Sequence, residues 1–246
     1  MKARIYPIFL LLLCACAAMA EPVQVVVPNN LANAEGNSSM SDFLNSPTFR
    51  MQMVFDASQF GALANGAGVT NSLTSISFRL DSASRSAVLY VFDGASVSLS
   101  TTLRGPDNLS TVFSDNSGPD RVTVFNGALA FGAAYQPTMN PQPLVENITL
   151  TTPFHYSPSQ GNLLVDIRGV SGHVLFLGEL DAEATTSDSV SRVFAFSNLA
   201  TTGTADTLGL VTGFNITVVP EPATWLFLAL GLLLFGFCKR RKIHGT

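Results

Sequence analysis

The sequence predicts an all-β protein whose exported part is a single β-sandwich with a jelly-roll-like arrangement. Short apolar runs alternate with polar residues at the period of a strand, as in the segment from Phe49 to Phe55. Gly, Asn or Pro stands at most junctions, and residues 21–219 contain no helical period of useful length. Many short strands at roughly even spacing are typical of a sandwich or barrel, and the size of this region favours one domain. An N-terminal signal peptide and a C-terminal transmembrane helix flank it.

Residues 1–20 have the three parts of a signal peptide. Lys2 and Arg4 form the charged region, Ile5 to Leu13 form the apolar core, and a small-residue site follows at the end. We expect cleavage between Ala20 and Glu21. The apolar core is too short to span a membrane by itself, so this segment does not belong to the mature fold.

All three cysteines, Cys14, Cys16 and Cys238, lie in the end segments. The exported middle therefore has neither a disulfide nor a thiolate nucleophile. A lipoprotein signal is the alternative interpretation of the N-terminus, because Leu13 and Ala15 precede Cys16 as they would in a lipobox. Under that interpretation Cys16 carries the lipid.

Residues 21–47 form an N-terminal strand and loop segment. Val23 to Val27 is an apolar run that we expect to form an edge strand, and Asn29 to Ser46 is expected to be a loop because it is rich in Asn, Ser and Ala.

Residues 48–218 form the predicted sandwich domain of about ten to twelve strands. We expect a turn over Gly61 to Gly68 and hairpin turns at Asp93-Gly94 and Asn126-Gly127, which are dipeptides favoured in two-residue turns. The run from Ala87 to Phe92 is dense enough in apolar residues to be a central strand. The expected strands are residues 48–55, 76–80, 87–92, 97–99, 122–124, 128–131, 145–150, 163–168, 174–177, 192–196 and 208–218.

Three arginines, Arg79, Arg168 and Arg192, lie inside or beside apolar strands. The spacings Arg79-Leu80-Asp81 and Asp166-Ile167-Arg168 indicate cross-strand ion pairs that hold register or protect edges. A structural role is therefore expected for all three guanidinium groups.

The charge balance excludes one class of partner. The whole chain has a net charge of −4, but residues 21–219 hold seven Arg, no Lys and sixteen Asp plus Glu, which is a net charge near −9. Nucleic-acid binding needs clustered cations that displace counterions. An acidic domain without lysine is therefore not expected to bind nucleic acid.

Asp115, Asn116 and Asp120 offer oxygen atoms at short spacing, which is what a weak extracellular Ca²⁺ site requires. The alternative is a Gly/Pro turn that carries solvated carboxylates, and the spacing does not match an EF-hand loop. The stretch that contains Asp181, Glu183 and Asp188 is expected to be a soluble loop. No other cofactor is indicated.

Catalytic patterns are weak. His155 and His173 are the only imidazoles outside the end segments, and the sequence has no H-E-x-x-H or G-x-S-x-G pattern. We therefore expect no enzymatic activity. A carbohydrate-binding module remains an alternative, although the only tryptophan, Trp225, lies in the tail and Tyr or exposed Phe would have to stack on sugars. A hydrolase that acts on a matrix polymer is a further, weaker alternative.

Residues 219–246 combine three features in a fixed order. Pro220, Glu221 and Pro222 come first, then the uncharged stretch 223–238, and then the basic cluster Lys239, Arg240, Arg241 and Lys242. The uncharged stretch predicts a transmembrane helix, slightly short of the ~20 residues usually needed but extended by snorkelling cations. The basic cluster predicts a cytoplasmic end, so that the rest of the chain lies outside.

This C-terminal order resembles the PEP-CTERM sorting signal of exopolysaccharide-producing Gram-negative bacteria. The resemblance implies recognition by exosortase, a membrane cysteine protease, and cleavage near Pro220, Glu221 and Pro222. The strings Ser98 to Thr102 and Gly161 to Arg168 are also similar to ectodomains that recur among PEP-CTERM proteins, an uncharacterised group that brings no activity with it.

Together these features predict an exported, non-enzymatic surface or extracellular-matrix protein. We expect it to be anchored transiently in the inner membrane, cleaved by exosortase and delivered to the cell surface or beyond. Its role there is expected to be structural or adhesive, within an exopolysaccharide or biofilm.

Overall fold

A computed structural model describes residues 22–42, 46–61, 63 and 69–220. These residues form thirteen strands and five short 3-10 helices, so the predicted all-β class is confirmed. The expected signal peptide, 1–20, and the expected membrane helix, 223–238, lie outside the described residues. In the part of the chain that is described, no helix has the length and apolarity needed to cross a bilayer.

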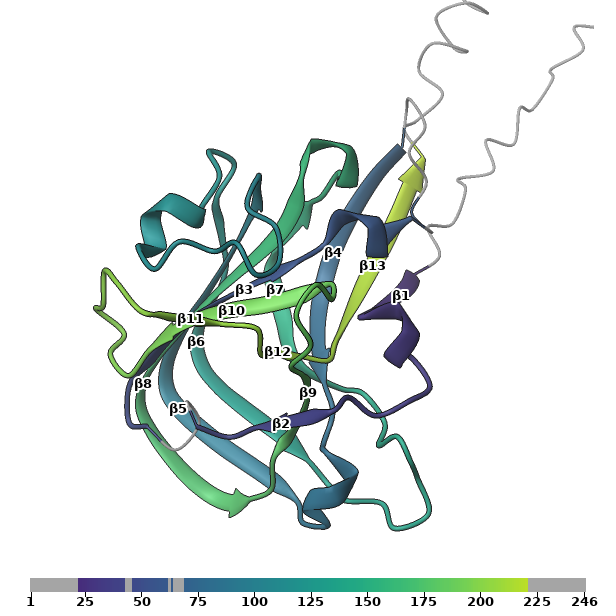
Figure 1. The fold of residues 1–246 in the computed structure, drawn as a ribbon, viewed down its shortest axis with the longest axis vertical. Helices are drawn as coiled ribbons and strands as arrows, with labels where there is room; N and C mark the ends of the chain where they lie inside the picture. Colours follow the sequence, from purple (N-terminus) through teal and green to yellow (C-terminus); the bar gives the residue numbers. More distant parts are fainter. Residues whose placement is uncertain (1–21, 43–45, 62, 64–68, 221–246) are drawn as a thin grey trace, which may run out of the picture.

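The strands form three antiparallel sheets (Figure 1). In spatial order, the four-stranded sheet contains β1 (Pro22–Val27), β13 (Thr212–Pro220), β4 (Val69–Phe78) and β7 (Val145–His155). The six-stranded sheet contains β11 (Thr204–Asp206), β10 (Val190–Ala195), β3 (Phe49–Phe55), β8 (Asn162–Leu177), β5 (Val88–Thr102) and β6 (Val122–Ala133). A small third sheet contains β12 (Gly209–Leu210), β9 (Leu180–Glu183) and β2 (Ser38–Met40).

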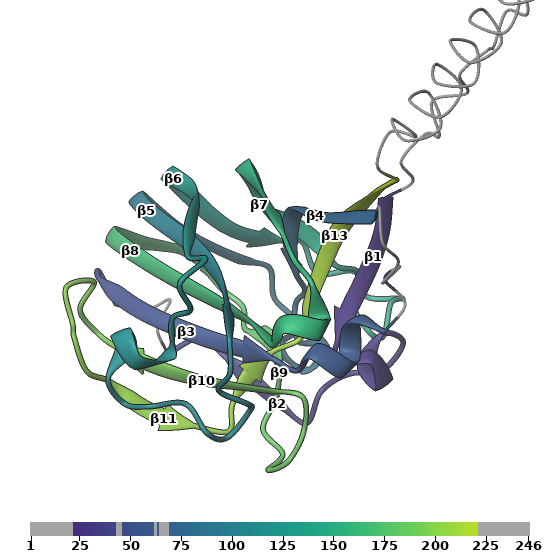
Figure 2. The same ribbon diagram turned by 90° about the horizontal axis from the view of Figure 1, so that it is seen from above.

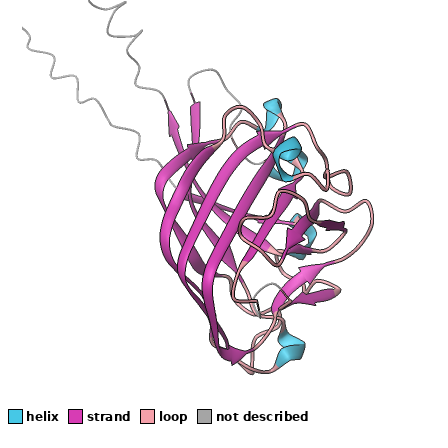
Figure 3. Cartoon of the chain, turned by 90° about the vertical axis from the view of Figure 1, so that its left-hand side faces the viewer, coloured by secondary structure: helices cyan, strands magenta, loops and turns pink. Residues whose placement is uncertain are grey.

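The chain passes several times between the two larger sheets. The chain alternates between them from β3 to β4 to β5, returns through β6, β7 and β8, and ends in β13. The layers are therefore β1-β13-β4-β7 and β3-β8-β5-β6, with β10 and β11 added at one edge (Figure 2). The predicted β-sandwich is confirmed. Figure 3 shows the strands as a broad curved wall, with the short helices and long loops gathered on one side.

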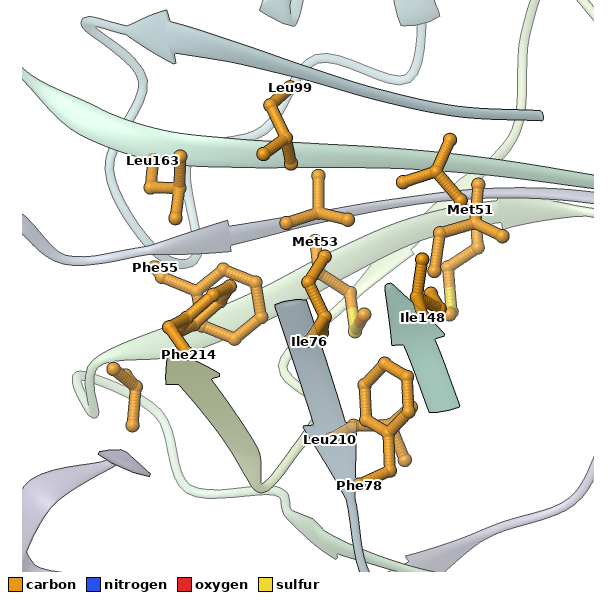
Figure 4. Close-up of a cluster of buried hydrophobic side chains, with 14 of the residues drawn as sticks. Met51, Met53, Phe55, Ile76, Phe78, Leu99, Ile148, Leu163, Leu210 and Phe214 are labelled. Carbon is orange, nitrogen blue, oxygen red and sulfur yellow. The ribbon is translucent and has the colours of Figure 1, made fainter. Parts of the chain in front are cut away.

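The core lies between the two layers, where the inward side chains of both sheets meet. Phe55 from β3 packs edge-to-face on Phe214 from β13, with ring centroids 4.9 Å apart. Phe78 from β4 contacts Phe131 from β6 at 5.6 Å. Figure 4 shows Met51 and Met53 of the same core beside Ile76 and Ile148. Burial of alternating apolar residues from both sheets therefore stabilises a domain that contains no cysteine.

Two predicted hairpin turns are wrong. Asp93-Gly94 lies inside the fifteen-residue strand β5, and Asn126-Gly127 lies inside β6. The two dipeptides lie near each other, since Ala95 pairs with Gly127 and the ladder shifts register between Phe92 and Ala95. The two dipeptides therefore lie at an irregularity of the β5–β6 ladder and not at a chain reversal. Pairing of the two strands before and after this point outweighs the local preference for a turn.

Two further boundaries also differ from the prediction. Residues 163–168 and 174–177, expected as separate strands, belong to the single strand β8. The segment from Asn29 to Ser46, expected to be a loop, contains the 3-10 helix η1 (Asn29–Leu31) and the strand β2. β2 pairs with β9 and buries Met40, and a strand of three residues is too short to show a period in the sequence.

Phe214→Ala should destabilise the domain by about 3–5 kcal/mol, because it leaves a cavity against Phe55 and Phe60. Urea unfolding followed by far-UV circular dichroism measures the loss. Phe176→Ala is the matched control, since 55% of Phe176 is exposed and its removal should cost less than about 0.5 kcal/mol. Equal losses for the two variants would contradict the packing described here.

Candidate functional site

The two ends of the described chain meet at one end of the four-stranded sheet. Pro22, the first residue of β1, pairs with Thr217 of β13. The expected signal-peptide cleavage site, Ala20 and Glu21, lies outside the described residues but directly precedes Pro22. Pro220 is the last residue of β13, whereas Glu221 and Pro222 lie outside the described residues. Both expected processing sites therefore adjoin the same end of the sandwich.

β13 is an interior strand of its sheet up to Thr217, because β1 pairs with one edge and β4 with the other. Beyond Thr217, β4 is the partner of β13 among the residues that the structure describes. Val218 pairs with Asn71, Val219 with Thr70 and Pro220 with Val69. These six residues, Val69–Asn71 and Val218–Pro220, form a two-stranded extension that we call the terminal ribbon (Figure 1).

The four-stranded sheet has few charged groups. Its strands contain a single Asp or Glu residue, Glu146, and a single histidine, His155, with no Arg or Lys. Polar contacts on this sheet join neutral side chains, such as the amide of Asn215, which donates to Ser75 Oγ at 2.8 Å. The acidic groups of the chain are thus concentrated on other elements.

Arg79 and Asp181 form a buried ion pair. Arg79 Nη2 lies 2.6 Å from Asp181 Oδ2, and the two side chains are 1% and 0% exposed. Arg79 also donates to the carbonyl of Ala34, and Asp181 Oδ1 accepts from Gly36 N at 2.9 Å. Arg79 thus makes an ion pair across the Leu80–Leu180 bridge, and its partner is Asp181 and not the neighbouring Asp81. Asp81 instead accepts from Ala83 N at 2.6 Å and caps a turn, because neighbours at i and i+2 do not meet across a ladder.

Arg50 and Asp166 form a second buried pair on the outward face of the six-stranded sheet. Arg50 Nη2 lies 2.7 Å from Asp166 Oδ2, and Gln52 Nε2 donates to the same oxygen at 3.0 Å. Arg168, the expected partner of Asp166, is 3.7 Å away on the same strand and adds a longer contact. The pair that crosses from β3 to β8 was missed, since Arg50 lies 116 residues from Asp166 in the sequence.

Arg192 holds an edge of the six-stranded sheet, as the sequence indicates. Its guanidinium is 3% exposed and lies 3.0 Å from Asp42 Oδ2 and 2.9 Å from Asp206 Oδ1. Hydrogen bonds to these two carboxylates raise the pKa of Arg192, although burial opposes the effect. The side chain therefore ties β10 to β11 and to the segment before β3.

The expected calcium ligands Asp115, Asn116 and Asp120 are engaged in contacts within the fold. Asn116 is 1% exposed, accepts from Ser110 N at 2.8 Å and donates to Gln52 Oε1 at 3.0 Å. Asp115 accepts from the Ser110 hydroxyl, whereas Asp120 accepts from the backbone of Thr101 at 2.9 Å. These contacts hold the loop between β5 and β6 on the sheet. In the described ranges, no three His, Cys, Asp or Glu side chains are grouped to hold a metal ion.

The stretch expected to be a soluble loop is structured: Asp181 and Glu183 lie in β9, and Asp188 is partly buried. Asp188 lines an open groove of about 470 Å³, together with Asp56 and Glu183. Its Oδ1 accepts from Val190 N at 2.8 Å, but its buried Oδ2 has no hydrogen-bond partner among the described residues. Burial, with the nearby charges of Glu183 and Asp107, raises the pKa of Asp188 to about 6.

The histidines form two separate contacts. His155 Nδ1 lies 2.8 Å from Ser72 Oγ, its neighbour across the β4–β7 ladder. Among the hydrogen bonds of the described residues, none joins His155 to a carboxylate that would complete a triad. His173 lies within β8 and contacts Asp93 at 3.0 Å, with both side chains more than half exposed.

Two other open grooves border polar loops. One of about 590 Å³ is lined by residues that include Glu35 and Asp81, and the other, of about 440 Å³, includes Asp120 and Gln160. Neither of these grooves, nor the one that contains Asp188, is lined by Ser72 or His155. None of these three grooves therefore places a substrate beside the Ser72–His155 contact.

The comparison with known families identifies the C-terminal feature. Residues 218–242 match the model of the PEP-CTERM protein-sorting motif. This chain carries a PEP-CTERM sorting motif. The match begins at Val218, the first β13 residue of the terminal ribbon. Neither a curated protein nor a solved structure matches the chain.

The PEP-CTERM motif implies export, transient anchoring in the membrane and processing by an exosortase. The motif includes Pro220, Glu221, Pro222 and the basic residues Lys239, Arg240, Arg241 and Lys242, as the sequence indicates. The cleavage position within it stays a prediction, as does the signal-peptide site.

Asp188→Asn should stabilise the protein at pH 8 and have little effect at pH 4. Because the pKa of Asp188 is raised above 3.8 to about 6, the folded state holds a proton that the unfolded state has already released. The stabilisation provided by the protonated form is lost as the pH rises through about 6. Asn retains the acceptor for Val190 N without the charge, and solvent screening limits the gain to about 1 kcal/mol.

Urea unfolding of Asp188→Asn at the two pH values measures this gain. Asp115→Asn removes an exposed carboxylate and controls for the general loss of negative charge. Equal effects of Asp188→Asn at pH 4 and pH 8 would show that the unpaired Oδ2 is not the cause.

Proposed function

We propose that this chain is a non-enzymatic structural or adhesive component of the cell surface or extracellular matrix. The main support for the proposal is that the PEP-CTERM motif begins within β13, the last strand of the β-sandwich. Buried arginines of this sandwich pair with carboxylates of the same chain, so these charges serve the fold. The material to which it contributes would be the exopolysaccharide or biofilm outside the cell.

Exposed apolar side chains support an adhesive role. Leu175, Phe176 and Leu177 lie at the end of β8 and are 60%, 55% and 71% exposed. A second group, Phe196 and Leu199, is 56% and 79% exposed. Several large apolar side chains grouped at two places on an exported domain favour contact with another surface.

Replacing Pro220, Glu221 and Pro222 with Ala should leave the full C-terminal segment on the protein and keep the protein in the membrane fraction. The reason is that exosortase recognition depends on the triplet. Intact mass and cell fractionation, with and without the exosortase, measure processing. Ser159→Ala with Gln160→Ala, at exposed positions of the short 3-10 helix Pro158–Gln160, is the control and should be processed normally.

The role in the matrix is tested in a strain that lacks the protein. We expect weaker cohesion of cell aggregates, restored by the wild-type chain and not by the uncut variant. Normal cohesion in the deletion strain would argue against a structural or adhesive role, even where processing is intact.

A carbohydrate-binding module is the second candidate, because the exposed rings of Phe176 and Phe196 can stack on sugars. The combined change of Phe176 and Phe196 to Ala should lower retention on the purified exopolysaccharide at least about tenfold, since two stacking contacts are lost. Leu199→Ala is the control, because it removes an even more exposed apolar group that has no ring. Failure of the wild-type protein to bind any matrix sugar would exclude this candidate.

A hydrolase acting on matrix polymer is the weakest candidate. The contact between Ser72 and His155 favours it. Among the described residues, no hydrogen bond joins His155 to a carboxylate, and the three grooves described above lie elsewhere, so this support is weak. We therefore keep the non-enzymatic function as the proposal.

A further inference from the structure

Three guanidinium groups surround a single carboxylate, that of Asp166, on the outward face of the six-stranded sheet. They belong to Arg50 of β3, to Arg168 of β8 and to Arg121, which directly precedes β6. A nitrogen of Arg50 lies 2.7 Å from a carboxylate oxygen of Asp166, one of Arg121 lies 3.6 Å away and one of Arg168 lies 3.7 Å away. Three positive charges against one negative charge leave these four residues, which we call the arginine patch, with a net charge of +2.

The carboxylate of Asp166 is already occupied by hydrogen bonds. Its Oδ1 accepts from Arg50 Nε at 3.2 Å, and its Oδ2 accepts from Arg50 Nη2 at 2.7 Å and from Gln52 Nε2 at 3.0 Å. Arg121 and Arg168 lie beyond hydrogen-bond distance from it. Among the described residues, no other carboxylate forms an ion pair with either of them. Asp166 therefore neutralises Arg50, and two further positive charges remain.

The surroundings of Arg168 disfavour its charge. Arg168 is the direct partner of Arg50 across the β3–β8 ladder, and like charges opposite each other destabilise a sheet. Its buried Nε has no hydrogen-bond partner among the described residues. Burial lowers the pKa of Arg168, and the charges of Arg50 and Arg121 add to this effect, whereas Asp166 opposes it. An anion at the patch would relieve this repulsion.

The residues outside the described ranges contain few acidic side chains. Residues 43–45, 62 and 64–68 include no Asp or Glu. The two terminal segments include only Glu21 and Glu221, which directly adjoin Pro22 of β1 and Pro220 of β13 in the sequence. Both strands belong to the other large sheet. The counter-ion of the patch is therefore expected from outside the chain.

Two of the three arginines are accessible to a ligand. The side chains of Arg121 and Arg168 are 40% and 32% exposed. Since both lie near the same carboxylate group, one anion can reach both. Arg121 Nη2 also donates to Ser98 Oγ at 3.1 Å, and this oxygen lies 3.2 Å from Oγ1 of the exposed Thr123. Guanidinium groups bind carboxylates and similar oxyanions through paired N–H donors, so the donors of an anion site are present.

We propose that the arginine patch binds an anionic group, a carboxylate or a sulfate, of a polysaccharide, and that Arg121 and Arg168 contact this group. The inference rests on the proposed surface role for the choice of a polysaccharide. Residues 21–219 hold sixteen Asp plus Glu against seven Arg, and this excess repels a densely charged polymer such as nucleic acid. The patch therefore fits sparse anionic groups on a chain of otherwise neutral sugars.

The test measures retention of the full chain, purified in detergent, on dextran, on lightly carboxymethylated dextran and on lightly sulfated dextran. We expect retention on a charged dextran and none on plain dextran, and the polymer that retains the protein identifies the anionic group. Arg121→Gln and Arg168→Gln should each weaken binding about tenfold, because a charge-assisted contact is lost. Arg85→Gln is the matched control, since it removes the same charge at an exposed position outside the patch and should bind as the wild type does.

Thermal unfolding separates ligand binding from a structural role of Arg168. Arg168→Gln removes the charge opposite Arg50 and should leave the melting temperature unchanged or raise it. A lower melting temperature together with lost binding would assign Arg168 to the fold and overturn the proposal. An equal loss of binding in Arg85→Gln, no retention of the wild type on either charged dextran, or tighter binding to double-stranded DNA would overturn it as well.

Failure of this proposal and failure of the proposed function are distinguishable in the strain that lacks the protein. Weak cohesion that the chain with both Arg121→Gln and Arg168→Gln restores fully would overturn the patch as the matrix contact, while the proposed function stands. Normal cohesion in the deletion strain, with retention on a charged dextran that depends on Arg121 and Arg168, would overturn the structural role and support the anion site.

Discussion

The structure depends on the placement of β13 between β1 and β4. β13 pairs with β1, the first strand of the domain, along one edge and with β4 along the other. Its residues Phe214 and Ile216 lie in the core. The four-stranded layer can therefore close only when the last strand of the domain is available to pair. The last three residues of β13, Val218–Pro220, are also the first residues of the PEP-CTERM motif.

The distribution of charge follows from an acidic composition without lysine. Each buried guanidinium needs a carboxylate, because an unpaired buried charge is strongly destabilising. Arg79, Arg50 and Arg192 meet this need with partners far away in the sequence. The four-stranded sheet, whose last strand leads into the sorting motif, is almost free of charged residues.

The candidate site could be predicted only where its parts are contiguous. Pro220, Glu221, Pro222 and the basic cluster stand in one short segment, and their order is recognisable without a fold. The pairing of Thr70 with Val219 carries no such signal, because the two residues are 149 positions apart in the sequence. For the same reason Asn116, whose oxygen resembles a calcium ligand in the sequence, serves to hold a loop against Gln52.

The sequence by itself determined the all-β class, the sandwich and the sorting motif, because alternation and motif order are local properties of a chain. Only the tertiary structure decided which strands are continuous, which charges pair and where the motif begins relative to the sheet. Asp93-Gly94 illustrates the difference, since its local preference for a turn is overridden by the pairing of β5 with two neighbours. A break in β5 would lose hydrogen bonds to strands that are distant in the sequence, and a short sequence window contains no information about those partners.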